Sequence, residues 1–181
     1  MYWAAQNYML ASQYDKAETC SRDAIVCFKR QKDETEKKFY LMGILSLGDA
    51  LFCQQKYQEA LDTYQIELDG YSAWKPRSEK HADALEDMAK VEVRLKKFED
   101  AKKHYQAALD IYKTLKLDTK YSNTYSSLMV CLRKAGDNDT ADKMEQDAES
   151  KSKAVYQRLL NDELPSLETT RKYLGSMTYT N

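Results

Sequence analysis

A short pattern recurs along the chain at a nearly constant interval. An aromatic residue is followed three positions later by alanine in three places, Tyr14–Ala17, Tyr57–Ala60 and Phe98–Ala101. A fainter copy centres on Ala141, and the four alanines stand 43, 41 and 40 residues apart. Self-similarity at such a period is typical of stacked repeats, in which each unit covers the apolar face of its neighbour. This repeat constrains the fold more than any other feature of the chain.

The residues before each alanine repeat as well. A small residue stands twelve positions earlier at Ala5, Gly48 and Ala89, and Met129 holds the fourth place. Apolar residues stand one and four places before these, and such spacings are helical. Each unit is therefore predicted to be two antiparallel helices that cross closely at the small residues, because a larger side chain there would push the helix axes apart.

These units resemble the tetratricopeptide repeat. The small and aromatic positions of that family are matched by Gly48, Ala89, Ala101, Tyr14, Tyr57 and Phe98. The basic repeat has about 34 residues, and the longer units here resemble the kinesin-light-chain-like class. Glu92 departs from the family, since it stands where a large apolar residue is usual. The resemblance implies an all-α fold, a right-handed superhelical array of antiparallel helix pairs.

The pattern predicts four helix pairs over residues 1–160. The pairs occupy approximately 1–31, 32–75, 76–117 and 118–160, with helices expected at 1–12, 14–30, 34–55, 57–74, 77–96, 98–116, 119–134 and 139–160. Asp33 and Asp118 are the predicted N-caps, and Gly136 is expected to end a helix. Residues 161–181 fall outside the pattern, which leaves a short capping helix or a disordered tail open. The missing first turn before Met1 favours an excised piece of a longer array over a natural start.

Composition agrees with helices and excludes several classes of protein. Only 5 glycines and 2 prolines occur, which argues against a turn-rich β protein. The 28 Lys and Arg residues are balanced by 29 Asp and Glu residues, so the basic excess of a nucleic-acid binder is absent. No apolar run approaches the ~18 residues that cross a bilayer, and no signal peptide opens the chain.

The four cysteines indicate a reducing compartment. None forms a C-x-x-C pair, and Cys20 and Cys27 would lie too far apart on one helix for a disulfide. We therefore expect reduced thiols and a cytoplasmic protein.

No pattern marks a catalytic, cofactor or metal site. Phosphate-binding glycine loops, metalloprotease motifs and nucleophile elbows are all absent. His81 and His104 have no second ligand at metal spacing. We expect no enzymatic activity, no cofactor and no bound metal.

The concave face of the array is the predicted binding surface. In the family that the repeats resemble, the first helix of each pair lines this face. The matching positions include Leu45, Asp49, Phe52, Asp83, Glu86, Lys90, Arg94, Asn123, Ser126, Val130, Arg133 and Lys134. Some chaperone adaptors of the family clamp a C-terminal carboxylate with Lys and Asn at particular places in the groove. Those places carry Tyr2, Gln6, Leu45, Asp49, Asp83 and Asp87 here, so chaperone tails are not the expected ligand.

Charge along this groove predicts the kind of ligand. Four cations are expected to converge on one stretch of it, Lys90, Arg94, Arg133 and Lys134. Asp83 and Glu86 are expected to lie one to two turns away, too far to neutralise all four. The predicted ligand is a protein or peptide segment with acidic residues beside an apolar anchor, which would meet Leu45 and Phe52.

The leading hypothesis is a non-catalytic scaffold that binds such a segment, as a monomer or weak homodimer, without nucleic acid or membrane. The alternative is a sensor or self-association segment of a larger signalling or regulatory protein. Output domains fused beyond either end would favour the alternative.

Overall fold

The computed structural model describes residues 2–30 and 33–162, and within them it holds eight α-helices and no strand. The helices are α1 (Tyr2–Leu10), α2 (Tyr14–Phe28), α3 (Glu34–Cys53), α4 (Tyr57–Trp74), α5 (Glu79–Arg94), α6 (Phe98–Thr114), α7 (Asp118–Ala135) and α8 (Asn138–Asp162). The all-α fold is confirmed, and each helix begins and ends close to its predicted bounds. Beyond Asp162, the segment expected to be a cap or a tail lies outside the described residues.

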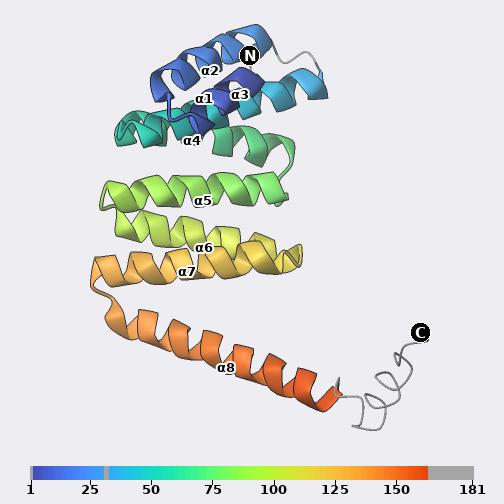
Figure 1. Ribbon diagram of the computed structural model, residues 1–181, viewed down its shortest axis with the longest axis vertical. Coiled ribbons are helices and arrows are strands. Elements are labelled where there is room, and N and C mark those ends of the chain that lie inside the picture. The colour runs from blue at the N-terminus through green and yellow to red at the C-terminus, as the bar shows by residue number, and fades with distance from the viewer. Residues whose placement is uncertain (1, 31–32, 163–181) are drawn as a thin grey trace, which may run out of the picture. The chain divides into compact units, whose positions relative to one another are not determined.

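The chain forms two compact units, residues 1–137 and residues 138–181. In the first unit, each helix packs against the next along the chain, and α1 also packs against α3. Figure 1 shows α5, α6 and α7 of this unit running across the molecule one beneath another. Helix α8 belongs to the second unit. Among the described helices, none is both long enough and apolar enough to cross a membrane.

The small and aromatic repeat positions form the core of the first unit. The alanines at the close crossings have no exposed surface: Ala5, Ala17, Ala24, Ala60, Ala89, Ala101 and Ala108. Tyr64, Tyr105 and Tyr112 fill the space between the helices and are at most 3% exposed. Small residues thus let the helix axes approach, and the tyrosine rings fill the rest of each seam.

The turn inside each helix pair has the same backbone conformation. The residue five places before each repeat alanine has a left-handed backbone conformation. Its φ is 55°, 62°, 60° and 87° at Ser12, Gln55, Lys96 and Gly136. The next amide then bonds to the carbonyl five residues back, as Lys97 N does to Glu92 O at 2.8 Å. This arrangement satisfies carbonyls that the end of a helix leaves unpaired. The predicted helix end at Gly136 is confirmed.

Of the two predicted N-caps, one is confirmed and one is wrong. The side chain of Asp33 accepts a hydrogen bond from Glu36 N at 2.8 Å. Asp118 is instead the first residue of α7, and Leu117 holds the N-cap position without a capping side chain. Leu117 packs against the core, so tertiary packing sets the start of α7 in place of a polar cap.

Gly48→Ala is expected to lower the free energy of unfolding by about 1–3 kcal/mol. A Cβ at Gly48 would lie 2.5 Å from Cε1 of Tyr64 and within 2.9 Å of two more ring atoms. The ring cannot simply move aside, because it is buried and its hydroxyl donates to Asp49 Oδ1 at 2.6 Å. Urea unfolding measures the loss.

Gly43→Ala is the matched control. Its Cβ would lie 3.1 Å from the nearest atom, Cγ1 of Ile25, and alanine is the better helix former by ~0.5–1 kcal/mol. We expect it to cost much less than Gly48→Ala. Equal losses in the two variants would contradict the role of the Tyr64 ring.

Candidate functional site

Five of the predicted groove residues meet at one pocket between α3, α5, α6 and α7. Its volume is about 290 Å³, and it is lined by Leu45, Asp83, Glu86, Asp87, Lys90, Tyr112, Lys120 and Asn123. We call it the charged pocket. The side chains of Lys90 and Lys120 are 45% and 37% exposed, so solvent and a ligand reach its rim.

Asp83 fixes one side of the charged pocket. Its carboxylate accepts hydrogen bonds from Tyr112 Oη at 2.8 Å, Lys80 Nζ at 3.0 Å and Lys120 Nζ at 2.6 Å. Burial acts to raise the pKa of Asp83, but the bonds from Lys120, Tyr112 and Lys80 hold it below its ordinary value. The carboxylate therefore stays ionised and holds the Lys120 side chain against α5.

Lys90 is neutralised by its own helix, so one expectation drawn from the sequence is wrong. Its Nζ lies 2.8 Å from Glu86 Oε1 and 3.0 Å from Asp87 Oδ1. Both carboxylates come from the preceding turn of α5, where residues three and four apart lie on one face. Although burial opposes it, the two carboxylates raise the pKa of Lys90. The four predicted cations thus do not act together.

Glu86 also joins α5 to α7. Its Oε2 accepts a hydrogen bond from Thr124 Oγ1 at 2.8 Å, and Tyr112 Oη lies 3.3 Å away. Burial, together with the negative charge of Asp49, raises the pKa of Asp87 to about 6, although Lys90 acts to lower it. The lining is therefore a bonded network held in place before any ligand arrives.

Phe52 is already covered within the chain. The guanidinium of Arg94 lies over its ring at 5.8 Å from the centroid, and the Tyr57 ring meets it edge-on at 5.5 Å. Asp49 lies beside this pair along α3, bonded to Tyr64, and burial raises its pKa. The Phe52 ring is therefore a poor receptor for the anchor of a ligand.

A second pocket lies in the same groove, between α5, α6 and α7. Its volume is about 250 Å³, and its lining is Val93, Tyr105, Ser126, Ser127 and Val130. We call it the apolar pocket. The sequence had placed two of these residues, Ser126 and Val130, on the concave face. Val130 falls on the repeat position that is charged at Asp49 and Lys90.

Arg133 and Lys134, the remaining predicted groove residues, are exposed in the last turn of α7. They line neither pocket.

Glu67 is a buried acid that sequence reasoning missed. It stands in α4 on the repeat position that is alanine at Ala24 and Ala108, and it is 1% exposed. Its Oε2 has no hydrogen-bond partner among the described residues. Burial first, and then the negative charges of Asp87 and Asp49, raise the pKa of Glu67 to about 9. Comparing the equivalent positions of the three clear repeats would have revealed it.

The departure at Glu92 has a local explanation. This acid is buried, and its Oε2 lies 2.8 Å from Nδ1 of the half-buried His104. The imidazole of α6 thus provides the polar partner that an acid in the α5–α6 seam requires. Within the described part of the chain, no group of three His, Cys, Asp or Glu residues is placed to hold a metal ion.

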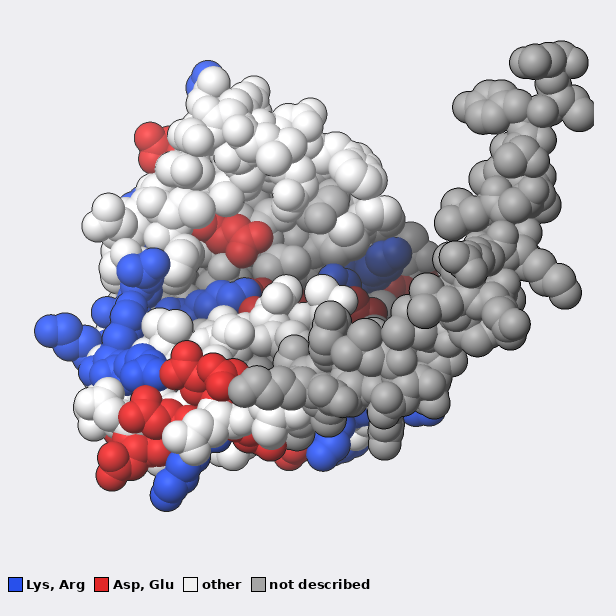
Figure 2. Space-filling view, turned by 60° about the horizontal axis from the view of Figure 1, so that its bottom comes forward, with Lys and Arg blue, Asp and Glu red and all other residues white. Residues whose placement is uncertain are grey.

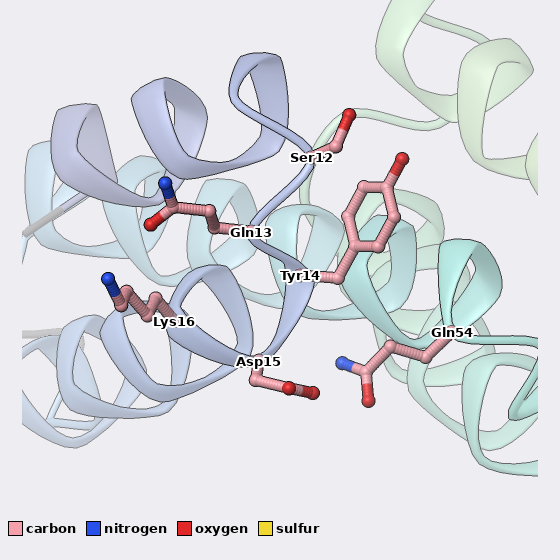
Figure 3. A pocket seen from close by; sticks show the side chains of 6 residues that line it. All are labelled: Ser12, Gln13, Tyr14, Asp15, Lys16 and Gln54. Carbon is pink, nitrogen blue, oxygen red and sulfur yellow. The ribbon is translucent and has the colours of Figure 1, made fainter.

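A larger pocket, of about 570 Å³, lies at the turn between α1 and α2 and is lined by Ser12, Gln13, Tyr14, Asp15, Lys16 and Gln54. Figure 3 shows the Asp15 and Gln54 side chains pointing toward each other across it. Gln54 Nε2 already donates to Glu18 Oε2 at 2.9 Å. Burial opposes it, but bonds from Arg22, Gln54 and Lys56 lower the pKa of Glu18 to about 2. These contacts tie the first helix pair to the second, which is a structural role.

Charges of both signs are mixed on the surface. Figure 2 shows a cluster of Lys and Arg side chains on the left of the face that it presents, next to Asp and Glu side chains. The whole chain has a near balance of 28 basic and 29 acidic residues.

Residues 40–114 match the family model described as tetratricopeptide repeat. No curated protein matches the sequence. The matched segment covers the second and third helix pairs, from α3 to α6. It therefore includes much of the lining of both pockets.

Two solved structures share the fold. The crystal structure of BtubC (BKLC) from P. vanneervenii aligns with a TM-score of 0.70 and 21% identity, over 78% of this chain and 57% of that one. The apo form of RapI aligns with a TM-score of 0.71 and 15% identity, over 97% of this chain and 67% of that one. The chain thus spans little more than half the length of BtubC, and at these identities the likeness shows the fold alone.

Proposed function

We propose that this chain, which matches the tetratricopeptide-repeat model over residues 40–114, is a non-catalytic scaffold that binds a protein or peptide segment in its concave groove. One observation carries the proposal. Side chains from three first helices, α3, α5 and α7, converge on two neighbouring open pockets. Convergent polar groups beside an apolar cavity are what a ligand site requires.

The cationic end of the groove supports a ligand with an acidic residue. Arg94 stands in the last turn of α5, and Arg133 and Lys134 stand in the last turn of α7. Lys90 is paired with Glu86 and Asp87, whereas the two arginines and Lys134 are exposed cations at this end of the groove. Because exposed charges are screened over ~8 Å at physiological ionic strength, this part of the binding should depend on salt.

Reversing Arg94 and Arg133 together to Glu is expected to weaken binding of the native partner at least fivefold at low salt and much less at high salt. The partner is first isolated with the wild-type chain and identified by mass spectrometry, and its affinity is then measured by calorimetry. The matched control reverses Lys103 and Lys113 of α6, which are exposed outside both pockets. An unchanged affinity at low salt would place the binding site elsewhere.

The alternative function is a sensor or self-association segment of a larger regulatory protein. Sedimentation at rising concentration separates the two proposals. A self-association segment would form stable dimers at low protein concentration without any added ligand, whereas the scaffold would be a monomer or at most a weak homodimer. Free thiols at Cys20, Cys53 and Cys131 favour a reducing compartment for either, and we propose the cytoplasm.

A further inference from the structure

We propose that the bound segment places an aliphatic side chain in the apolar pocket and, close to it in sequence, a lysine or arginine side chain in the charged pocket. This inference rests on the proposed function, and it specifies the chemistry of the ligand. It also moves the anchor away from Leu45 and Phe52, where the sequence alone placed it.

The two pockets lie side by side along the same pair of helices. On α5, Lys90 of the charged pocket and Val93 of the apolar pocket are three residues apart. On α7, Asn123 and Ser126 are likewise three residues apart. Three residues of helix span ~4.5 Å, while side chains on one side of an extended peptide are ~7 Å apart. A peptide lying along the groove can therefore fill both pockets with side chains one or two residues apart.

The apolar pocket accepts a side chain without charge. No ionic side chain lines it, and Val130 is 52% exposed while Tyr105 is 3% exposed. The two serine hydroxyls in the lining already donate within α7, Ser126 to Ser122 O and Ser127 to Asn123 O, each at 3.1 Å. A ligand carbonyl or amide would gain little from these two groups. An aliphatic group would bury the exposed valine surface, which stabilises the complex by ~25 cal/mol per Å².

The charged pocket has an excess of negative charge. Four carboxylates face three ammonium groups at this site, Glu79, Asp83, Glu86 and Asp87 against Lys80, Lys90 and Lys120. The three lysines are already paired with these carboxylates. An incoming carboxylate would meet the three like charges of the lining at close range. An incoming ammonium or guanidinium would find carboxylate oxygens beside bonds that are already formed.

Asp49 adds a further negative charge near this lining. Burial is the main cause that raises the pKa of Asp87 to about 6; Lys90 acts to lower this pKa, and the charge of Asp49 acts to raise it. A bound cation would relieve the repulsion between Asp49 and Asp87. The groove is thus bipolar, with exposed cations at the ends of α5 and α7 and this acidic pocket one turn or more back along the same helices.

The test selects peptides from a random dodecapeptide library displayed on phage, using the folded chain as bait. We expect the selected peptides to carry Leu, Ile or Val within three residues of Lys or Arg. The best synthetic peptide should lose affinity at least tenfold on Val130→Asp and at least threefold on Asp87→Asn. Matched controls change the same residue types outside the groove, Val26→Asp on α2 and Asp110→Asn on α6, and both should leave the affinity unchanged.

Two results would overturn the inference, and they differ in what else they affect. Selected peptides that carry an aliphatic residue but no Lys or Arg within three residues of it, with binding still lost on Val130→Asp, would overturn the basic specificity and leave the peptide-binding groove in place. No enriched peptide, or peptides whose affinity is the same on Val130→Asp and Val26→Asp, would overturn the inference and the proposed function together. Circular dichroism of each variant shows that the fold is retained.

Discussion

Ala101→Leu is expected to lower the free energy of unfolding by up to about 3 kcal/mol. Ala101 has no exposed surface, and it lies on the face of α6 that also carries the buried Tyr105 and Ala108. Leucine would add an isopropyl group where the seam between α5 and α6 leaves no room. The helix axes must then move apart or neighbouring side chains must leave their rotamers, and each response costs packing energy.

Urea denaturation of Ala101→Leu beside Gln106→Leu tests this prediction. Gln106 is exposed on the same helix, so the control adds leucine without overpacking the seam, and we expect its stability to stay within ~0.5 kcal/mol of wild type. The loss in Ala101→Leu should also exceed that of any groove substitution. Coincident unfolding curves for Ala101→Leu and wild type would show that the repeat register is wrong.

Glu67→Gln is expected to stabilise the fold by about 3 kcal/mol at pH 7 and to remove most of the pH dependence of stability between pH 5 and pH 8. The pKa of Glu67 is raised from 4.5 to about 9 in the folded chain. The folded chain therefore binds this proton more tightly than the unfolded chain does. The contribution of this proton to the free energy of unfolding is fully present below the pKa of the unfolded chain. The free energy of unfolding then falls by about 1.4 kcal/mol per pH unit as pH rises toward the pKa of the folded chain.

Urea midpoints of wild type, Glu67→Gln and Glu59→Gln at pH 5, 7 and 8 check this prediction. Glu59 is an exposed carboxyl on the same helix, and its variant should follow wild type at every pH. Part of the dependence near pH 6 should survive in Glu67→Gln, because the pKa of Asp87 is also raised. Parallel curves for wild type and Glu67→Gln would mean that the Glu67 carboxyl is solvated or partnered in the folded chain.

The repeat was sufficient to predict the fold because its small and aromatic residues act locally in each seam. The spacing alone predicts that Gly48, Ala101 and Tyr64 pack between helices, and all three are buried in the structure. The start of α7 was missed because packing of Leu117 decides it. Spacing alone does not reveal where packing replaces a polar cap.

The site was harder to predict because its chemistry depends on pairs of residues. Lys90 was treated as a free cation, yet Glu86 and Asp87 on the preceding turn neutralise it. Ser126 and Val130 were placed on the groove, but the apolar pocket itself was missed because Val93 and Tyr105 come from other helices that only the folded chain brings beside them. Five groove residues were nevertheless found together at the charged pocket, because the family register had already assigned them to one face.

The central claim, a peptide-binding groove on the first helices of the pairs, is tested most directly by mapping amide chemical shifts of the ¹⁵N-labelled chain as the identified partner segment is added. The account predicts that the largest changes fall at Glu86, Val93 and Val130, on α5 and α7. The exposed Ile66 on α4 and Leu115 after α6 should not change. Changes centred on Ile66 and Leu115, with the groove residues unmoved, would contradict it.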